Sequence, residues 1–430
     1  MKTDPINFLN SSRFDILAKY IYANFLEKNI DSTFGLDLYK EHLKVWNDCR
    51  HGDGKDGLQI YLDTFHELLS SIKEKGFDPD ESLINSTEEL KLLNGGHRVA
   101  SCLLNNEEIC YEIGGSGQTN VNYEYFKNKG NFVPGGLSEK WCDAIATEYC
   151  KLKPNTFIAT IFPSAIGKAA RSREVPRAIW EVEQVIKEKS DIFYKKIVNL
   201  YNYGPLNLMK EMYYGEAWGG DRQKNFPGLR SKVNLCFRSS SPIIIYVITT
   251  KQKEDPRYIK ERVRNIFKIG NHSIHINDTK EETLRLSRCL LNNNSIHFIN
   301  NATPAYFNNF ENYISFFRGY IQDNELDIED YCVTASSTLS RYGLREGNDL
   351  DYLHRGQEIH GHDMIHSHNS YAVGRYHTSV DDVIYNPLNH FYFNDVKYAS
   401  LDVIKKLKEK RMEEKDKKDL RLIEETLYPT

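Results

Sequence analysis

The feature that most constrains this chain is an apolar segment that runs into small residues and is followed, one short helix later, by two closely spaced carboxylates. The segment is Cys332-Val333-Thr334-Ala335-Ser336-Ser337, and Asp349 and Asp351 follow it. Residues i and i+2 of a strand point to the same face of a sheet, so Asp349 and Asp351 would present both carboxylates to one spot. Such a pair suits Mg²⁺, which proteins usually hold by one or two carboxylates together with substrate phosphates.

Ser336 and Ser337 stand where the apolar strand is expected to turn into a helix. Backbone N–H groups and hydroxyls at such a turn can approach a phosphate closely. The pattern therefore predicts metal-assisted transfer to or from a nucleotide phosphate, with the nucleotide on the serine turn and Mg²⁺ held by Asp349 and Asp351.

This arrangement resembles the nucleotidyltransferase superfamily of the DNA polymerase β type, whose signature is a Gly-Ser pair followed by D-x-D. The closer likeness is to a bacterial branch in which G-x-R leads into D-x-D, here Gly343-Leu344-Arg345 and then Asp349-Leu350-Asp351. Ala335 stands where the family has its first glycine. The resemblance covers roughly residues 326–430 and implies a mixed sheet with helices and a phosphate contact from Arg345.

The same branch ends in a helix of the form K-x-x-R-x-x-x-K-D-x-x-D, and this chain has Lys408, Arg411, Lys415, Asp416 and Asp419 at that spacing. At about 100° per residue, four of them (all but Asp416) would form one charged stripe on a single helix. The resemblance implies that Lys408, Arg411 and Lys415 bind phosphate.

The family also needs a third carboxylate that takes a proton from the attacking group or completes the metal shell. Glu358 and Asp363 are the nearest candidates, and the sequence does not choose between them. A cluster of histidines surrounds Asp363, namely His360, His362, His366 and His368. It could bind a transition metal, although surface imidazoles in a loop explain it more simply.

A second candidate site is the turn Leu93-Asn94-Gly95-Gly96-His97-Arg98 at a strand-to-helix junction. Glycines let the backbone approach a ligand, the helix start offers N–H groups to an anion, and Arg98 adds paired donors. The segment from about Leu58 to Ile113 resembles the ParB/sulfiredoxin fold, which binds nucleotide phosphates at this turn and includes kinases of free serine. The resemblance implies phosphate binding by Gly95, Gly96, His97 and Arg98. A tight turn with a structural histidine is the alternative.

Composition narrows the class of protein. The chain has 430 residues, a net charge of −4 and a pI of about 6.4, so no general attraction to nucleic acid is expected. The longest apolar stretch, residues 242–248, is far short of the ~20 residues that span a bilayer. Eight scattered cysteines without a C-x-x-C indicate reduced thiols, and we expect a cytoplasmic protein without a membrane span.

The pattern along the chain predicts a multidomain α/β (α+β) protein. We expect a helical segment at 1–55, the ParB/sulfiredoxin-like unit at 56–150, an α/β middle domain at 151–325 and the nucleotidyltransferase-like domain at 326–430. In the middle domain, strands are expected at Phe157–Phe162, Ile243–Ile248, Ser273–Ile276 and Ile296–Ile299, and helices at Pro176–Lys189, Tyr258–Phe267 and Lys280–Leu291.

Two further segments of the middle domain could contact a ligand. Glycines flank Glu216 and Trp218, which either line a ligand wall or plug a gap in the packing. His272 and His275 could ligate a metal or donate to a phosphate, although their spacing matches no standard zinc site.

These observations favour a Mg²⁺-dependent nucleotidyl- or phosphoryl-transferase that uses a nucleoside triphosphate, ATP or CTP, and a small-molecule acceptor. By analogy, it could make an activated precursor for surface polysaccharide. Two alternatives remain. A toxin or defence nucleotidyltransferase acting on RNA predicts a basic groove around residues 397–418, and a non-catalytic nucleotide-binding module is favoured by Ala335.

Overall fold

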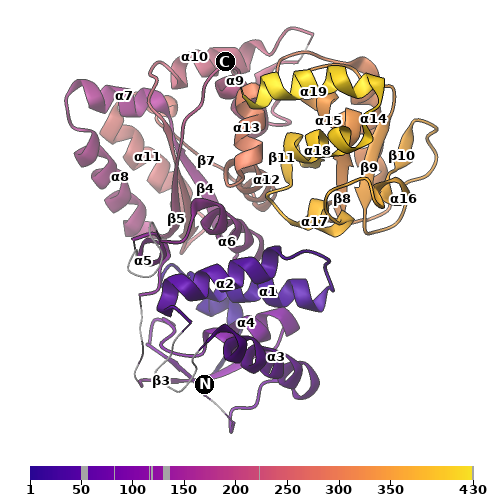
Figure 1. The fold of residues 1–430 in the computed structure, drawn as a ribbon. Coiled ribbons are helices and arrows are strands. Elements are labelled where there is room, and N and C mark those ends of the chain that lie inside the picture. The colour runs from indigo at the N-terminus through magenta and orange to yellow at the C-terminus, as the bar shows by residue number, and fades with distance from the viewer. Residues whose placement is uncertain are drawn as a thin grey trace.

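The computed structural model describes residues 1–49, 57–81, 83–115, 117, 120–128, 136–221 and 223–428. It confirms the mixed α and β class: helices alternate with strands that form three sheets within these residues. Figure 1 shows an N-terminal unit below, a middle unit at the upper left and a C-terminal unit at the upper right. None of the helices in the described ranges is both long and apolar enough to cross a bilayer.

The N-terminal unit packs helices against a small sheet in the order β1-β3-β2. Its strands are β1 (Lys2–Thr3), β2 (Ile84–Ser86) and β3 (Ile109–Ile113), and its helices include α1 (Asp15–Glu27), α2 (Phe34–Asn47), α3 (Leu58–Lys75), α4 (Gly96–Asn105) and α5 (Tyr123–Asn128). Because β1 pairs with β3, the two segments predicted at 1–55 and 56–150 share one sheet. The predicted boundary at residue 55 lies outside the described residues.

The middle unit is built on an antiparallel sheet in the order β5-β6-β4-β7. Its strands are β4 (Thr156–Ile161), β5 (Ser190–Val198), β6 (Ile243–Thr250) and β7 (Ile274–Ile276). Its helices are α6 (Glu139–Leu152), α7 (Pro163–Arg171), α8 (Val175–Lys189), α9 (Gly204–Met212), α10 (Pro227–Cys236), α11 (Asp255–Phe267), α12 (Lys280–Leu290) and α13 (Asn293–Asn301). Helices α7 and α8 connect β4 to β5, and α11 connects β6 to β7. Apart from α9 and α10, which are inserted between β5 and β6, this is a β-α-β-β-α-β arrangement of the ferredoxin-like type. Three predicted strands and all three predicted helices are confirmed within a few residues.

The strand predicted at Ile296–Ile299 is wrong, because these residues lie in α13. A short apolar run cannot be assigned by periodicity alone. Here the preceding Asn292 decides, since its side chain accepts a hydrogen bond from Ser295 N–H and caps the first turn of a helix.

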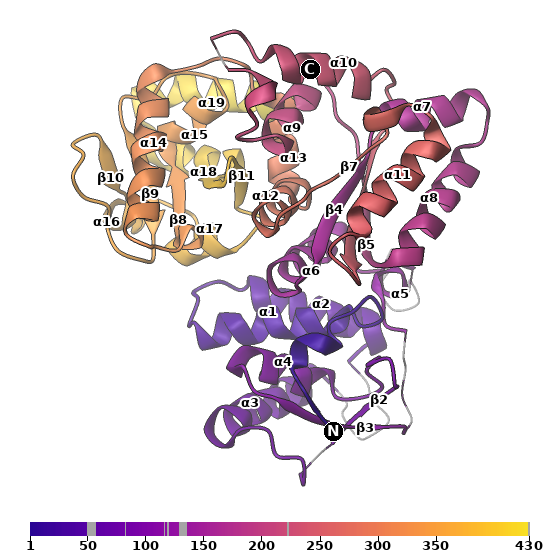
Figure 2. The same cartoon turned by 180° about the vertical axis from the view of Figure 1, so that it is seen from behind.

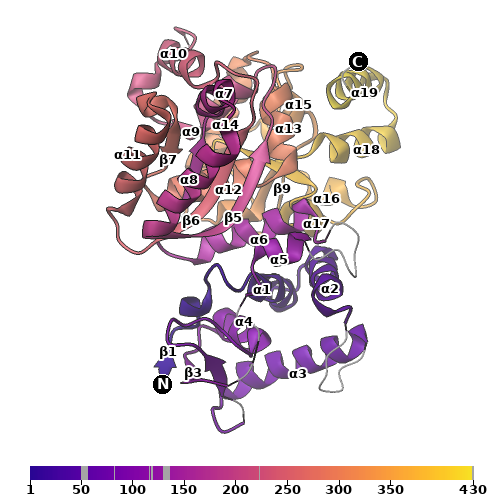
Figure 3. The ribbon, with the colours of Figure 1, turned by 90° about the vertical axis from the view of Figure 1, so that its left-hand side faces the viewer.

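Strand β6 is apolar along its length because both faces of the sheet are covered. Ile244, Tyr246 and Ile248 pack against α7, α8 and α11, which lie over one face in Figure 3. Ile243, Ile245 and Val247 point the other way, into a large core shared with the other two units. The shared core fixes the three units against one another.

The C-terminal unit has a mixed sheet in the order β10-β9-β8-β12-β11. Its strands are β8 (Tyr331–Thr334), β9 (Leu350–His354), β10 (Ile365–Ser367), β11 (His390–Phe393) and β12 (Val396–Ala399). Its helices are α14 (Asn308–Asp323), α15 (Ala335–Arg341), α16 (Asn369–Ala372), α17 (Val380–Tyr385), α18 (Leu401–Arg411) and α19 (Glu414–Leu427). The apolar run that opens the sequence motif is β8, and the D-x-D motif starts β9.

The single charged helix predicted over Lys408–Asp419 is also wrong. Helix α18 ends at Arg411, Met412 adopts a left-handed backbone with φ 54°, and α19 starts at Glu414 (Figure 2). A capping box between Glu413 and Asp416 starts the second helix. The predicted spacing is therefore spread over the two arms of a helical hairpin.

Candidate functional site

Strands β8 and β9 place the serine turn beside the D-x-D motif. The strands are antiparallel, and Thr334, the last residue of β8, lies opposite Asp351. The backbone N–H of Asp351 donates to Ser337 Oγ (3.1 Å), and the same hydroxyl donates to the carbonyl oxygen of Asp349 (3.2 Å). One buried hydroxyl therefore ties the helix start to both ends of the motif, and the structure brings these predicted residues together.

Asp349 and Asp351 differ in exposure and in partners. Asp351 is buried, and its Oδ1 lies 3.0 Å from Nε2 of His368. Asp349 is half-buried, and burial together with the neighbouring charge of Asp351 raises the pKa of its carboxyl, against the opposing effect of His366. A divalent cation bound beside Asp349 would favour the ionised form of its carboxyl.

The strand next to the D-x-D motif carries imidazoles. Strand β10 is parallel to β9, and His366 on β10 lies opposite Asp351. Of the two candidates for a third carboxylate, Glu358 is exposed in the segment after β9. Asp363 is exposed just before β10, next to Met364, whose carbonyl oxygen accepts a hydrogen bond from the backbone N–H of Leu350 in the motif (2.8 Å). Among the described residues, no group of three or more His, Cys, Asp or Glu side chains is arranged to hold a metal. A cation here would depend on Asp349, Asp351 and oxygens of the substrate.

Ala335, which replaces the family's glycine, takes a backbone conformation that glycine favours. Its φ is +53°, in the left-handed region, and it is the first residue of α15. Only glycine adopts this region without steric cost. The turn that the D-x-D motif faces is thus formed with an alanine, at a cost in free energy.

The predicted phosphate-binding cations are held by carboxylates of the hairpin. Arg345 Nη2 donates to Asp419 Oδ2 (2.7 Å), and buried Lys408 lies 2.6 Å from the same carboxylate. Arg411 Nε donates to Asp416 (2.8 Å). Lys415 is exposed and pairs with Glu413 (3.0 Å). In this structure the network joins α18 and α19 to the loop that leads into the D-x-D motif.

The glycine-rich turn near residue 95 lies in the N-terminal unit, away from the D-x-D motif (Figure 1). Gly95 caps α4 with φ +104°. A Cβ on Gly96 would lie 2.9 Å from Arg13 Nη2 and 3.1 Å from Asp15 Oδ2. The second glycine therefore leaves room for a buried cluster in which Asp15 pairs with Arg13 and Lys19, a cluster that sequence reasoning missed.

His97 and Arg98 make contacts inside the same unit. His97 Nε2 lies 2.9 Å from the hydroxyl of Tyr39, and its ring packs edge-on against Phe65. Arg98 Nη1 donates to the carbonyl oxygen of Leu83 (2.8 Å), and burial lowers the pKa of its guanidinium. These contacts explain both side chains structurally, and phosphate binding at the turn stays a prediction.

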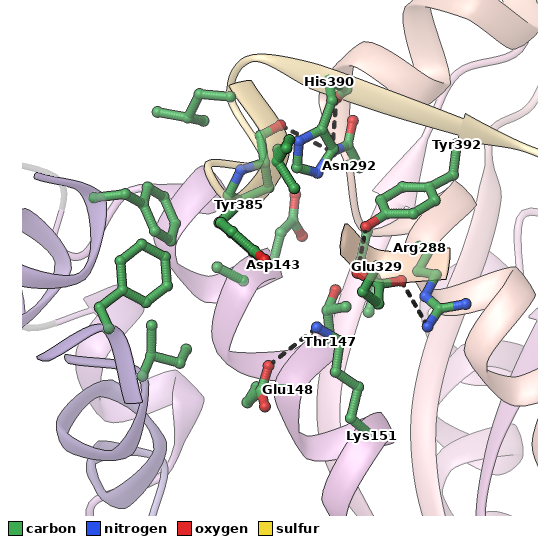
Figure 4. A pocket seen from close by; sticks show the side chains of 18 of the residues that line it. Asp143, Thr147, Glu148, Lys151, Arg288, Asn292, Glu329, Tyr385, His390 and Tyr392 are labelled. Atoms are coloured by element: carbon green, nitrogen blue, oxygen red, sulfur yellow. Dashed lines mark hydrogen bonds and ion pairs between the residues drawn. The ribbon is translucent and has the colours of Figure 1, made fainter. Parts of the chain in front are cut away.

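A cavity that no motif predicted lies where the three units meet. It has a volume of about 320 Å³ and is lined from α1, α2, α6, α13, α17 and β11. Figure 4 shows its polar side, where Glu329 pairs with Arg288 (2.7 Å) and accepts from the Tyr392 hydroxyl (2.8 Å). Burial raises the pKa of Glu329. The positive charges of Lys397, Arg288 and Lys151 lower this pKa more strongly, so it lies well below its usual range. Apolar side chains also line the cavity, among them Phe25 and Phe34.

The charges of the residues that line this cavity largely neutralise each other, and the lining combines apolar and polar side chains. Such a cavity suits a small molecule with an apolar end and a hydrogen-bonding end. Its lining comes from segments more than 300 residues apart, such as Tyr20 and Tyr392. No local pattern in the sequence could have identified it.

The chain matches no protein-family model, and neither the curated proteins nor the solved structures include one that is significantly similar to it.

Proposed function

We propose that the chain is a Mg²⁺-dependent nucleotidyl- or phosphoryl-transferase whose reaction centre is the D-x-D motif of β9. The observation that carries the proposal is the hydroxyl of Ser337, which ties the start of α15 to both ends of the motif. Two carboxylates at the start of a strand, beside a serine turn, are what a nucleotide–metal complex requires.

In this proposal Asp349 and Asp351 hold the cation, and the Ser336–Ser337 turn receives the phosphates. When bound, the metal would neutralise charge on the transferred group, which is the main source of rate in this chemistry. His368 orients the carboxylate of Asp351 through the 3.0 Å contact. Arg345 and the hairpin keep the loop before β9 in place.

The acceptor we propose is a small molecule, and an activated precursor of surface polysaccharide remains an analogy. The N-terminal unit would add phosphate binding at Gly95, Gly96, His97 and Arg98, as its resemblance implies.

Two observations bear on the alternatives. Around residues 397–418, Lys397, Lys408 and Arg411 are each bound to carboxylates, which does not favour an RNA groove there. Ala335 remains the support for a module that binds without turnover.

The test is to incubate the purified chain with Mg²⁺ and labelled ATP or CTP, with small alcohols or with RNA. Label in a small molecule supports the proposal, label in RNA supports the toxin alternative, and binding without product supports the module. A nucleotide that binds the folded state also raises its melting temperature. Absence of both product and binding with every nucleotide would overturn the proposal.

A further inference from the structure

Positive charge is concentrated in the middle unit of an otherwise acidic chain. Residues 139–301, which form the middle unit, contain 27 Lys and Arg against 17 Asp and Glu, a net charge of +10, although the whole chain carries −4. A strong charge asymmetry between parts of a chain indicates a polyanionic partner for the basic part. The whole-chain charge conceals this asymmetry.

Six of these basic residues line two hollows near α7, α10 and α11, which Figure 1 shows at one end of the middle sheet. The first hollow, of about 270 Å³, is lined by Lys232, Lys260 and Arg264. The second, of about 580 Å³, is lined by Lys168, Arg171 and Arg238. They meet at the short helix η3 (Gly270–His272), since Asn271 lines the first and His272 lines the second.

Most of these cations lack a carboxylate partner. Lys260 pairs with Asp278 (2.8 Å), but the other five form no ion pair with any described residue. In addition, Arg264 Nε and His275 Nε2 are buried atoms without a hydrogen-bond partner among the described residues. Buried polar atoms are nearly always satisfied in folded proteins, so these two point to a ligand in the first hollow.

An exposed aromatic side chain stands at the first hollow. Trp218 is 48% exposed and lies in the short helix η2 (Ala217–Gly219). Its ring packs edge-on against Tyr213 at 4.8 Å, and Tyr213 packs in the same way against His275 at 5.1 Å. The glycine-flanked loop and the histidine strand that the sequence singled out therefore meet at one site.

We propose that this end of the middle unit binds single-stranded nucleic acid, with phosphates in the two hollows and a base stacked on Trp218. Cationic grooves combined with aromatic rings are what single-strand binding needs, and only unpaired bases can stack on a side chain in this way. A bilayer surface is planar and would not enter the hollows. The proposal concerns binding alone and does not depend on the transfer reaction at the D-x-D motif.

The test measures binding of a labelled oligouridylate by fluorescence anisotropy at several salt concentrations. The double variant Lys232→Gln/Arg264→Gln should bind more weakly. The slope of log K against log salt should become less steep by about 1.4, because each lost phosphate contact removes about 0.7 from the slope. The matched control is Arg257→Gln/Arg262→Gln, which removes the same charge from α11 at positions that pair with Glu261 and Glu188. Trp218→Leu should weaken binding at least about five-fold, whereas Trp180→Leu, at a Trp that is 60% exposed on α8, should not.

Thermal melts of each variant separate loss of the ligand site from loss of the fold. Equal losses in the test and control variants would overturn the proposal, because they would show attraction to net charge alone. Unchanged binding in both test variants would overturn it too. So would tighter binding to duplex RNA, to a mononucleotide or to phosphatidylserine vesicles than to the oligouridylate.

Discussion

Nε2 of His368 lies 3.0 Å from Oδ1 of Asp351, so the buried carboxylate of the D-x-D motif is held by an imidazole from the loop after β10. Asp349, two residues earlier, is half-buried and has its pKa raised by burial and by Asp351. The two carboxylates therefore have different environments, with one fixed in place and the other near solvent.

We predict that His368 positions Asp351 for metal binding, a role that can be separated from a general loss of structure. Replacing His368 by Leu should reduce transfer and raise the Mg²⁺ concentration required by about 10- to 100-fold, as for other groups that orient a metal ligand. His368→Gln, which can still donate to Asp351, should recover most of the activity. The exposed His360, replaced by Leu, serves as the control. Equal activity in His368→Leu and the wild type would contradict the positioning role.

Ala335→Gly should stabilise the protein by about 1 kcal/mol, because Ala335 has a φ of +53° that glycine adopts without steric cost. The control is Ala144→Gly in the middle of α6, which should destabilise by about 0.5–1 kcal/mol. Denaturant unfolding of both variants measures the two changes. Destabilisation by Ala335→Gly would mean that the strained turn is not formed in solution.

Asp419→Asn removes the charge that both Arg345 and buried Lys408 contact. We expect the free energy of unfolding to fall by about 3 kcal/mol, since removing one member of a buried ion pair leaves the other uncompensated. Glu414→Gln breaks the exposed pair with Lys417 on the same helix and should change stability by less than about 1 kcal/mol. If the two variants lose the same amount, the hairpin network is not what joins α18 to α19.

Glu211 should make the protein less stable as the pH rises. Its side chain is fully buried, and burial raises its pKa from 4.5 to about 8 although Asn394 N–H donates to it (2.8 Å). The folded state favours the neutral form of Glu211. The contribution of Glu211 to the free energy of unfolding is therefore complete below pH about 4.5 and is lost as the pH rises to about 8. Between these pH values the free energy of unfolding should fall by about 1.4 kcal/mol per pH unit. Glu211→Gln should remove this slope in urea unfolding measured across that range, and an unchanged slope would contradict the assignment.

Much of the local structure followed from sequence periodicity and end signals. The buried strand β6 and helices α8 and α11 were predictable because their apolar patterns are long and have clear ends. The helix α13 was mistaken for a strand because its apolar run is short, and the capping contact from Asn292 was not recognised. The break at Met412 was missed because nothing in the charge pattern marks a left-handed residue there.

The candidate site was predictable only where its residues are close in sequence. Ser337, Asp349 and Asp351 meet through one β-α-β connection, so their spacing carried the information. The Glu329 cavity and the basic hollows could not be found in this way, since each is lined by segments that meet only in the tertiary structure. The charge of the middle unit was visible in the sequence but is lost in the whole-chain average.

The most direct test of the central claim is transfer of label from a nucleoside triphosphate by the variant Asp349→Asn/Asp351→Asn. The control is Asp323→Asn, which changes an exposed carboxylate at the end of α14. We predict that the double variant keeps its circular dichroism spectrum but loses transfer at least about 100-fold, whereas the control keeps it. Undiminished transfer by the folded double variant would contradict the account.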